Sequence, residues 1–437
     1  MWSPSSVRPK KRYRSDGART ENGMRPLDGG HPEMAPGCSR VDALLHHPNV
    51  RRALAWLEAH ADDVMREQIR ICEIPAPPFG EAARAAYLRD RFRDLGLTRV
   101  HIDGVGNVRG WRPGRYSSPL VVLAAHLDTI FPAGTEIRVR QENGRFYAPG
   151  ISDNACGLAA MLALGEALNA AVIRTSGSLL LLGTVGEEGE GNLRGVRYVF
   201  EGAERVSDIS AFLALEGAGS EGIVHQALGS RRYRIHVRGP GGHSWGDFGA
   251  PNPIHPVVHT ALRLMHYPLP RVPRTRVSLT RIAGGEAINA IPQTAHVDVD
   301  VRSTSAAEIA RVERYLRESL EHAVRLEKRR CRSGNDRASL EYGIEVLGDR
   351  PAGSLPPEAE IVRIACDATH RLGRTPQWEC ASTDANLPMA LGVPALAIGT
   401  GGEAGNIHTL QEWYAPTDRA LGLKRALLIT LALVGIS

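Results

Sequence analysis

Residues 120–157, LVVLAAHLDTIFPAGTEIRVRQENGRFYAPGISDNACG, join an apolar run to the start of a helical pattern. The run LVVLAAH is hydrophobic on both of its faces, which is typical of a buried strand in a sheet that helices cover. The segment NACGLAAMLALGEALNAA, which begins at Asn154, has the length and composition of a helix. These patterns place His126 and Asp128 at the end of a strand, and they place Asp153 directly ahead of a helix.

Strand and helix patterns alternate on both sides of this stretch. SLLLLGTV and ISAFLALE predict two more buried strands, and RVRQENGRFY predicts a hairpin that turns at Asn143 and Gly144. Upstream, apolar residues recur at helical intervals through one helix at 49–74, and a second helix is expected at 80–96. The alternation indicates an α/β core with helices on both sides of a mixed sheet, and such folds bind ligands in loops at the strand ends.

A different sequence pattern begins near Gly222. The segments IVHQALGSRRYRIHVRG, RTRVSLTRIAGG and AHVDVDVRS predict three alternating strands of a sheet with one buried face, accompanied by helices at 254–266 and 306–327. Strand-like SLEYGIEVLG closes this block, and the later segments return to the first pattern. The sequence thus predicts a discontinuous α/β domain with an inserted α+β domain. The expected limits are a disordered tail at 1–40, the first part of the α/β domain at 41–225, the insertion at 226–350 and the second part at 351–437.

The positive charge of the chain is concentrated near its beginning. The formal net charge is +5, and residues 1–30 hold seven Arg or Lys against three Asp or Glu. The rest of the chain is nearly neutral, so its charge provides no argument for a nucleic-acid partner. Residues 1–40 are rich in Arg, Pro, Gly and Ser without an apolar pattern, which favours a solvated tail over a binding arm at RPKKRYR.

The cysteines and the apolar runs indicate a compartment. Six cysteines form no C-x-x-C pair, and a chain of this length needs no disulfides, which predicts free thiols in a reducing compartment. The N-terminus has no apolar stretch long enough for a signal peptide, and the run ALLITLALVGI at 426–436 is too short to span a bilayer. We therefore expect a cytoplasmic protein without a membrane partner.

Acidic and histidine residues recur where apolar strands run into polar or glycine-rich loops. Hydrolysis of an amide with two divalent ions needs imidazole and carboxylate ligands from several strand ends, one bridging carboxylate and a free carboxylate that handles the protons of water. Asp128 would point the same way as His126 if the strand continues, and it could accept from the second nitrogen of that imidazole. Glu187 could be the free base, and the ligands could be His126, Asp153, Glu188, Glu216 and His408.

Each of these residues also has an ordinary structural explanation. Asp153 with Asn154 could simply cap a helix, Glu187 with Glu188 could lie in a solvated loop, and His408 could be a surface histidine. The combination favours a site, because the residues follow buried strands in order and most have a neighbouring glycine, which lets backbone approach closely.

Ordered motifs from about residue 120 to 410 resemble the two-zinc metallopeptidase family that contains aminoacylase, acetylornithine deacetylase, glutamate carboxypeptidases and tripeptidase T. The motifs cover most of the chain, and chance would not assemble so many in order. They are AAHLDT, GISDNACGLAAML, GTVGEEGEG, ALEGAG, RGPGGHSW, GGEAINAIPQTAHVDVDVRS, STDANLPMALGVPALAIGTGG and NIHT.

The resemblance implies a role for each matched ligand. His126, Asp153 and Glu216 would hold one zinc ion. Asp153, Glu188 and His408 would hold the second, so that Asp153 bridges the pair. Cobalt or manganese would bind the same set of residues.

The resemblance also implies residues that act on the substrate. Asp128 would orient the first imidazole, and Glu187 would act as general base and then as general acid. The insertion resembles the dimerisation or lid domain of the family, whose His243 would reach into the partner subunit's site of a homodimer and stabilise the oxyanion. Asn289 and Arg302 would help to hold substrate, with Arg302 suited to a carboxylate. The ordinary alternatives are a packing role for His243 and, for Arg302, a pairing with a nearby acid.

The implied activity is metal-dependent hydrolysis of an amide bond in a small peptide or an N-acyl amino acid. Family members with Glu at the Glu216 position tend to be carboxypeptidases or deacylases, which favours that type. The segments TDANLP and GTGGEAGNIHT resemble a tripeptidase-T-like aminopeptidase instead, and Glu190 departs from the small or apolar residue expected after EEG. A member that binds metal or ligand without turnover is a further alternative, which the complete ligand set and Glu187 argue against.

Overall fold

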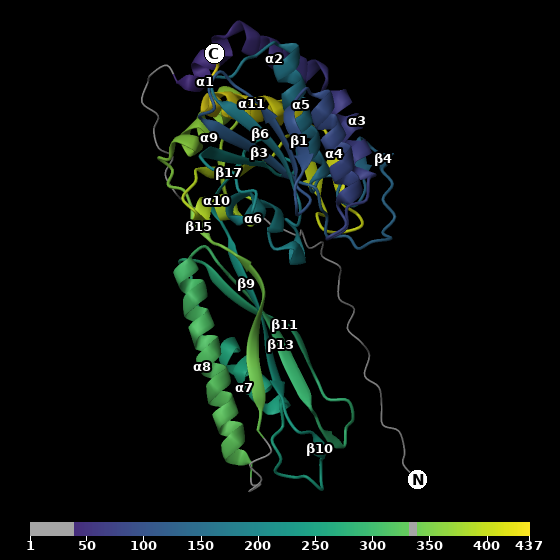
Figure 1. The fold of residues 1–437 in the computed structure, drawn as a ribbon, viewed down its shortest axis with the longest axis vertical. Coiled ribbons are helices and arrows are strands. Elements are labelled where there is room, and N and C mark those ends of the chain that lie inside the picture. Colours follow the sequence, from purple (N-terminus) through teal and green to yellow (C-terminus); the bar gives the residue numbers. More distant parts are fainter. Residues whose placement is uncertain (1–38, 332–338) are drawn as a thin grey trace, which may run out of the picture. The chain divides into compact units, whose positions relative to one another are not determined.

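A nine-stranded sheet forms the core of the fold (Figure 1). The computed structural model describes residues 39–331 and 339–437, so nearly all of the tail predicted at 1–40 lies outside the described residues. The strand order is β1-β2-β6-β3-β7-β17-β8-β15, and β16 pairs with β8. The bounds are β1 Thr98–Ile102, β2 Val108–Arg112, β3 Leu120–His126, β6 Ser178–Thr184, β7 Ile209–Leu215, β8 Gly222–Ala227, β15 Gly353–Ser354, β16 Gln377–Ala381 and β17 Ala395–Ile398.

Strand directions make this sheet a mixed one, as predicted. β3 pairs in parallel with β6 on one side and with β7 on the other, and β17 continues the parallel order beyond β7. β1 and β2 are antiparallel to each other, β2 is antiparallel to β6, and β8 is antiparallel to β17.

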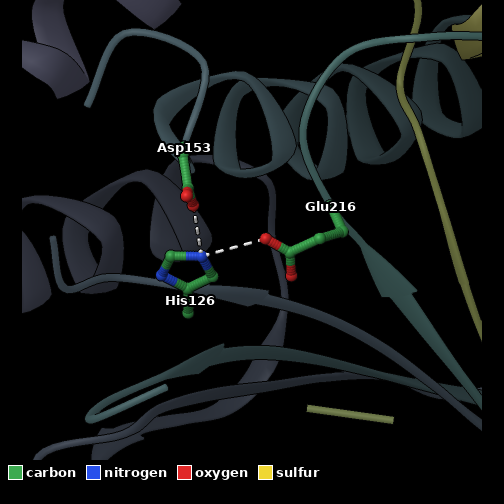
Figure 2. A group of neighbouring side chains, drawn as sticks. All are labelled: His126, Asp153 and Glu216. Atoms are coloured by element: carbon green, nitrogen blue, oxygen red, sulfur yellow. Dashed lines mark hydrogen bonds and ion pairs between the residues drawn. The ribbon is translucent and has the colours of Figure 1, made fainter. Parts of the chain in front are cut away.

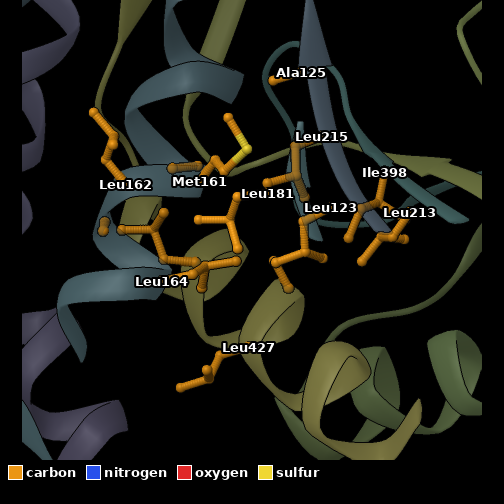
Figure 3. Packing of buried hydrophobic residues seen from close by; sticks show 14 of the residues in the cluster. Leu123, Ala125, Met161, Leu162, Leu164, Leu181, Leu213, Leu215, Ile398 and Leu427 are labelled. Carbon is orange, nitrogen blue, oxygen red and sulfur yellow. The ribbon is translucent and has the colours of Figure 1, made fainter. Parts of the chain in front are cut away.

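Helices cover both faces of the sheet, as predicted for an α/β fold. Along β3, Leu123 points into a large hydrophobic cluster, whereas its neighbour Val122 points into a second cluster on the opposite face. Figure 3 shows Leu123 in the first cluster with Met161 of α5 and Leu427 of α11. The first face also carries α1 Arg40–His46, α2 Pro48–Ala59, α3 Ala61–Cys72, α4 Ala82–Asp94, α5 Ala155–Ala170, α9 Glu360–Arg371 and α11 Arg419–Val434, and the second carries α6 Arg194–Glu201 and α10 Asn386–Ala390.

A second, antiparallel sheet contains four strands in the order β11-β13-β9-β14. Its alternating strands bury one face against two helices, which Figure 1 shows beside the strands. The limits of the inserted domain at 226 and 350 stay a prediction. The bounds are β9 Gly229–Arg238, β11 Thr275–Gly284, β13 Thr294–Ser303, β14 Glu341–Arg350, α7 Ile254–Met265 and α8 Ala306–Arg330, with a short ladder of β10 Gly242–His243 and β12 Ala290–Ile291.

A small four-stranded sheet contains the predicted hairpin. β4 Arg140–Glu142 and β5 Arg145–Tyr147 pair in antiparallel fashion around Asn143 and Gly144, which both have positive φ. This geometry confirms the turn that the Asn-Gly pair predicts. β19 Trp413–Ala415 pairs with β5, and β18 Glu403–Gly405 pairs with β19.

Two of the predicted elements are wrong in their extent. The single helix expected at 49–74 is divided at His60, whose backbone leaves the helical conformation while its ring nitrogen contacts the carbonyl of Trp56 at 2.9 Å. The single strand expected in IVHQALGSRRYRIHVRG is divided at Leu228, whose N–H donates to the carbonyl of Ala381. β8 therefore belongs to the central sheet and β9 to the second sheet.

Two further observations bear on the expected compartment. No helix among the described residues has the length and apolar character needed to cross a bilayer. The five cysteines at described positions are all free thiols, and Cys72 and Cys156 are buried.

Candidate active site

Three neighbouring strands bring the predicted site residues to one edge of the central sheet. β3 ends at His126, Glu187 and Glu188 follow the end of β6, and Glu216 directly follows β7. Because these three strands are parallel neighbours, the loops that follow them meet at the same edge. Asp153 arrives from another direction, two residues before α5 begins.

The first group of side chains surrounds the buried imidazole of His126 (Figure 2). Its Nε2 lies 2.9 Å from Oδ1 of Asp153 and 3.1 Å from Oε1 of Glu216. Two carboxylates from different loops thus converge on one nitrogen.

The second group shares Asp153 with the first. Nε2 of His408 lies 2.9 Å from Oδ2 of Asp153 and 2.9 Å from Oε1 of Glu188. His408 lies between β18 and β19 with a positive φ, and its side chain is half exposed. The two oxygens of Asp153 therefore face two different imidazoles, one deeply buried and one open to solvent.

The donor chemistry of both groups fits divalent metal ions. Imidazole nitrogen and carboxylate oxygen are ligand types of zinc, and within each group one ligand atom per residue lies within 4.8 Å of the others. His126, Glu187 and Glu188 satisfy the same distance criterion. The charge of so many carboxylates at a largely buried edge must be balanced by bound cations or by protons, because an uncompensated buried charge is costly.

Proton affinities at the site reflect this crowding. Hydrogen bonds to Asp153 and Glu188 raise the pKa of His408 to about 10. Burial opposes a charge on His126, but the carboxylates of Glu216 and Asp153 raise its pKa well above the usual value. Burial also raises the pKa of Glu216 to about 7. Protons would therefore compete with a metal ion for these atoms.

Glu187 is a buried acid that takes part in neither of the two groups joined by Asp153. Burial raises its pKa well above the usual value, and the guanidinium of Arg350 opposes that shift. Nη1 of Arg350 lies 3.1 Å from Oε1 of Glu187. A carboxylate held near the metal ligands, but outside the pairs that they form, is suited to exchange protons with a reacting water.

The contacts of Asp128 differ from those expected. β3 ends at His126, and Nδ1 of His126 contacts the Asp128 main-chain oxygen at 3.0 Å. The Asp128 carboxylate is farther from that nitrogen, at 3.8 Å, and accepts from the N–H groups of Glu187 at 3.0 Å and Glu188 at 2.8 Å. Asp128 thus contacts the imidazole through its carbonyl and the glutamate loop through its side chain, and its orienting role stays a prediction.

Three other predicted residues lie apart from the two groups. His243 is exposed on β10, where its Nδ1 accepts from Trp245 N and Gly246 N at 3.2 Å each. The Asn289 main chain accepts from Ser244, and Nε of Arg302 donates to Asp300 at 2.8 Å. Within residues 39–331 and 339–437, none of the three forms a hydrogen bond with either group. The Arg302 contact matches its ordinary alternative, and the roles of all three stay predictions.

Two buried charged residues that sequence reasoning missed, Glu412 and Arg350, form hydrogen bonds with residues of the site. Glu412 is fully buried, and its Oε1 accepts from Ser152 N at 2.8 Å and Asp153 N at 2.9 Å, while its Oε2 accepts from Gly150 N at 3.1 Å. Arg350 is the second. The only available signal was a charged residue in an apolar or strand-like context, in QEWYAP and VLGDRPAG, which no local pattern links to the site.

Comparison with known proteins defines the class of this fold and site. The model of peptidase family M20/M25/M40 matches residues 122–431, and the chain belongs to that family. It is accordingly a metal-dependent hydrolase of amide bonds, as the motifs predict.

A sequence relative agrees with that class, and two solved structures share the fold. Succinyl-diaminopimelate desuccinylase of Corynebacterium glutamicum is 26% identical over 79% of this chain and 90% of its own length. Aminopeptidase PepT from Bacillus cereus superposes with a TM-score of 0.68 at 21% identity, over 86% of this chain and 98% of that one. A dinuclear metal-binding M20 peptidase from Bacillus subtilis superposes with a TM-score of 0.61 at 16% identity, over 86% and 99%. The similarity in fold extends over most of the chain.

Proposed function

We propose that this enzyme uses two divalent metal ions to hydrolyse the amide bond of a small peptide or an N-acyl amino acid. Zinc is the metal that we propose. The observation that carries the proposal is the carboxylate of Asp153, whose two oxygens each lie 2.9 Å from a different imidazole. A carboxylate in that position is suited to bridge two ions.

The ligand sets follow from the two groups. His126, Asp153 and Glu216 would hold one ion, and Asp153, Glu188 and His408 would hold the other. When bound, the ions supply Lewis-acid chemistry for the scissile carbonyl and for water. Zinc suits these ligands, and cobalt or manganese fits the same donor types.

Glu187 would move the proton of the reaction. Its carboxylate accepts a proton from the water whose oxygen attacks the carbonyl carbon, and it then donates that proton to the leaving nitrogen as the C–N bond breaks. The products are a carboxylic acid and an amine. Burial of Glu187 keeps its proton affinity above that of an exposed glutamate, which suits a group that must both accept and release a proton.

A cavity beside the second group offers space for a small substrate. It has a volume of about 1200 Å³ and includes His408 in its wall. Phe131 and Leu410 provide apolar surface there, and Arg138 and Arg140 provide positive charge. This mixture is compatible with a short peptide or an acylated amino acid.

A homodimer is part of the proposal. On α7, Val258, Leu262 and Met265 are exposed at helical spacing, and β11 is an edge strand of the second sheet. An apolar helix face beside a free edge strand favours association with a second copy.

His243 would then act in the partner subunit's site, with Asn289 close to it because β10 pairs with β12. Arg302 would bind a substrate carboxylate after leaving Asp300.

A matched set of substrates tests the proposal and its direction. A dipeptide, its N-acetyl form and its C-terminal amide should be hydrolysed only by metal-loaded enzyme, with EDTA abolishing turnover. Loss of cleavage with the amide alone would identify a carboxypeptidase or deacylase, which Glu216 favours. Loss with the N-acetyl form alone would identify an aminopeptidase. Turnover that persists after complete metal removal would overturn the proposal.

The cytoplasm is the proposed compartment, since the described thiols are free.

A further inference from the structure

Arg350, the last residue of β14, reaches Glu187 from outside the central sheet. Its side chain is buried, and its Nη1 donates to Oε1 of Glu187 at 3.1 Å and to Oγ of Ser382 at 3.1 Å. Its Nη2 donates to the main-chain oxygen of Glu187. One planar guanidinium thus holds the side chain and the backbone of the same residue from two separate nitrogens, whereas a lysine ammonium would have to reach both oxygens from a single nitrogen.

The loop that carries Glu187 has little structure of its own to hold that side chain in place. Between β6 and α6 it contains one short 3-10 turn at Gly189–Gly191 and a glycine with positive φ on each side of the two glutamates, at positions 186 and 189. Asn192 and Leu193 also have positive φ. A glycine-rich backbone of this kind leaves many conformations accessible, so contacts from outside the loop must select one.

The second sheet provides several of those contacts. Nη1 of Arg232 on β9 donates to the Gly189 main-chain oxygen at 2.8 Å. The N–H of Asp349 on β14 donates to Oδ1 of Asn192 at 2.8 Å, and Arg197 donates to the main-chain oxygens of both Asn192 and Asp349. From the central sheet, the Asp128 carboxylate holds the two glutamate N–H groups. The loop is therefore fastened from two sheets.

We infer that Arg350 is a positioning residue for the general base, and that β9 and β14 hold the 186–193 loop so that the Glu187 carboxylate faces the reacting water. This inference rests on the proposed role of Glu187. Nothing in the assignment of the metal ligands requires Arg350, so its effect should fall on turnover and not on metal content.

Binding of a substrate carboxylate is the competing role for Arg350. Its Nε is buried without a protein partner among the described residues, so the guanidinium has a donor to spare. The two roles differ in kinetics. A positioning residue changes kcat at constant KM, whereas a substrate anchor changes KM, and does so for a free carboxylate but not for its amide.

The test compares Arg350→Met and Arg350→Lys with the control Arg234→Met, which removes a guanidinium paired with Asp298 on the second sheet. We expect both Arg350 variants to keep two metal ions per chain, to lose about 100-fold and about 10-fold in kcat respectively, and to keep KM within about threefold. Amide hydrogen exchange in the 186–193 segment should become faster in both variants, and the control should match the wild type.

A double-mutant cycle with Glu187→Gln separates this inference from the proposed function. If Glu187 is the base, Glu187→Gln is nearly inactive, and adding Arg350→Met costs little more, because the group to be positioned has been removed. Full additivity, a rise in KM alone, or wild-type kcat in Arg350→Met would overturn the role of Arg350 while leaving Glu187 in place. An active Glu187→Gln enzyme would instead overturn the proposed base. If Arg350→Met does not fold, wild-type kcat in Arg350→Lys contradicts the inference.

Discussion

Asp153 is the residue that the two groups of the site share. Its two oxygens face His126 and His408, and its own N–H is held by the buried carboxylate of Glu412. A ligand shared by two ions must be held more accurately than one that serves a single ion, because one displacement disturbs both sites. Glu412 is therefore expected to hold the bridging carboxylate in place.

Glu412→Gln should weaken metal binding without unfolding the protein. A glutamine amide can still accept from Ser152 and Asp153, but its NH2 group would oppose the N–H of Gly150. We expect affinity for the ions to fall by about 10-fold to 100-fold, measured by competition with a chromophoric chelator. Glu403→Gln, an exposed change on β18, is the control. Equal affinities in both variants would remove Glu412 from the support of the site.

Metal loading should release protons from the two imidazoles. Carboxylate neighbours raise the pKa of His408 to about 10 and the pKa of His126 well above its usual value, so both rings are protonated near neutral pH before metal binds. Because the raised pKa values favour the protonated form, metal affinity should fall as the pH is lowered. Calorimetry in buffers of different ionisation enthalpy should detect release of about two protons per chain at pH 7.5. A binding heat that is independent of the buffer would contradict this prediction.

The residues of the site differ in how far their positions could be predicted. His126, Glu188 and Glu216 follow buried strands and Asp153 precedes a helix, so local patterns place these four at strand ends or loops where α/β folds bind ligands. His408 lies between the short strands β18 and β19 and has no such local pattern. Arg350 and Glu412 could not be found in this way, because each contacts backbone or side chains far away in the sequence. The Asp128 carboxylate was assigned to the imidazole, yet it accepts from the N–H groups of Glu187 and Glu188, which a different strand end brings beside it.

At the scale of elements, β3 joins the hydrophobic core to the site. It is buried on both faces, and its last residue is His126. Leu123→Ala removes a side chain that is 1% exposed, and it should lower the free energy of unfolding by about 2–5 kcal/mol. Val346→Ala, at a position on β14 that is 43% exposed, should change it by less than about 0.5 kcal/mol. Urea denaturation of both variants checks the difference, and similar losses would contradict the packing described for β3.

Elements with strong local patterns were predictable, and those defined by distant contacts were not. The buried strands β3, β6 and β7, the helix α5 and the Asn143–Gly144 turn follow from hydrophobic runs and turn chemistry. The division between β8 and β9 has no local signal, because the two strands differ in their distant partners: β8 pairs with β16 and β17, whereas β9 pairs with β13 and β14. β16 also lacks a strong local pattern, because it is short and half-buried. Its position in the sheet is set by its pairing with β8.

At the scale of the whole molecule, the proposed role of His243 requires two copies of the chain. His243 is exposed, and among the described residues it forms no hydrogen bond with a candidate metal ligand of its own chain. His243→Ala and Glu187→Gln homodimers should both be inactive, since each lacks one essential group in every site. Mixed and reassociated, they should recover up to about a quarter of wild-type activity, because half of the dimers contain one complete site. No recovery despite heterodimer formation, shown by native mass spectrometry, would contradict a contribution from the partner.

The most direct test of the central claim measures metal content and turnover of Glu187→Gln in the same preparation. If Glu187 moves the proton while the two groups around Asp153 hold the ions, the variant keeps two metal ions per chain and loses turnover by about 10³-fold or more. Turnover close to that of the wild type, with both ions bound, would contradict the account.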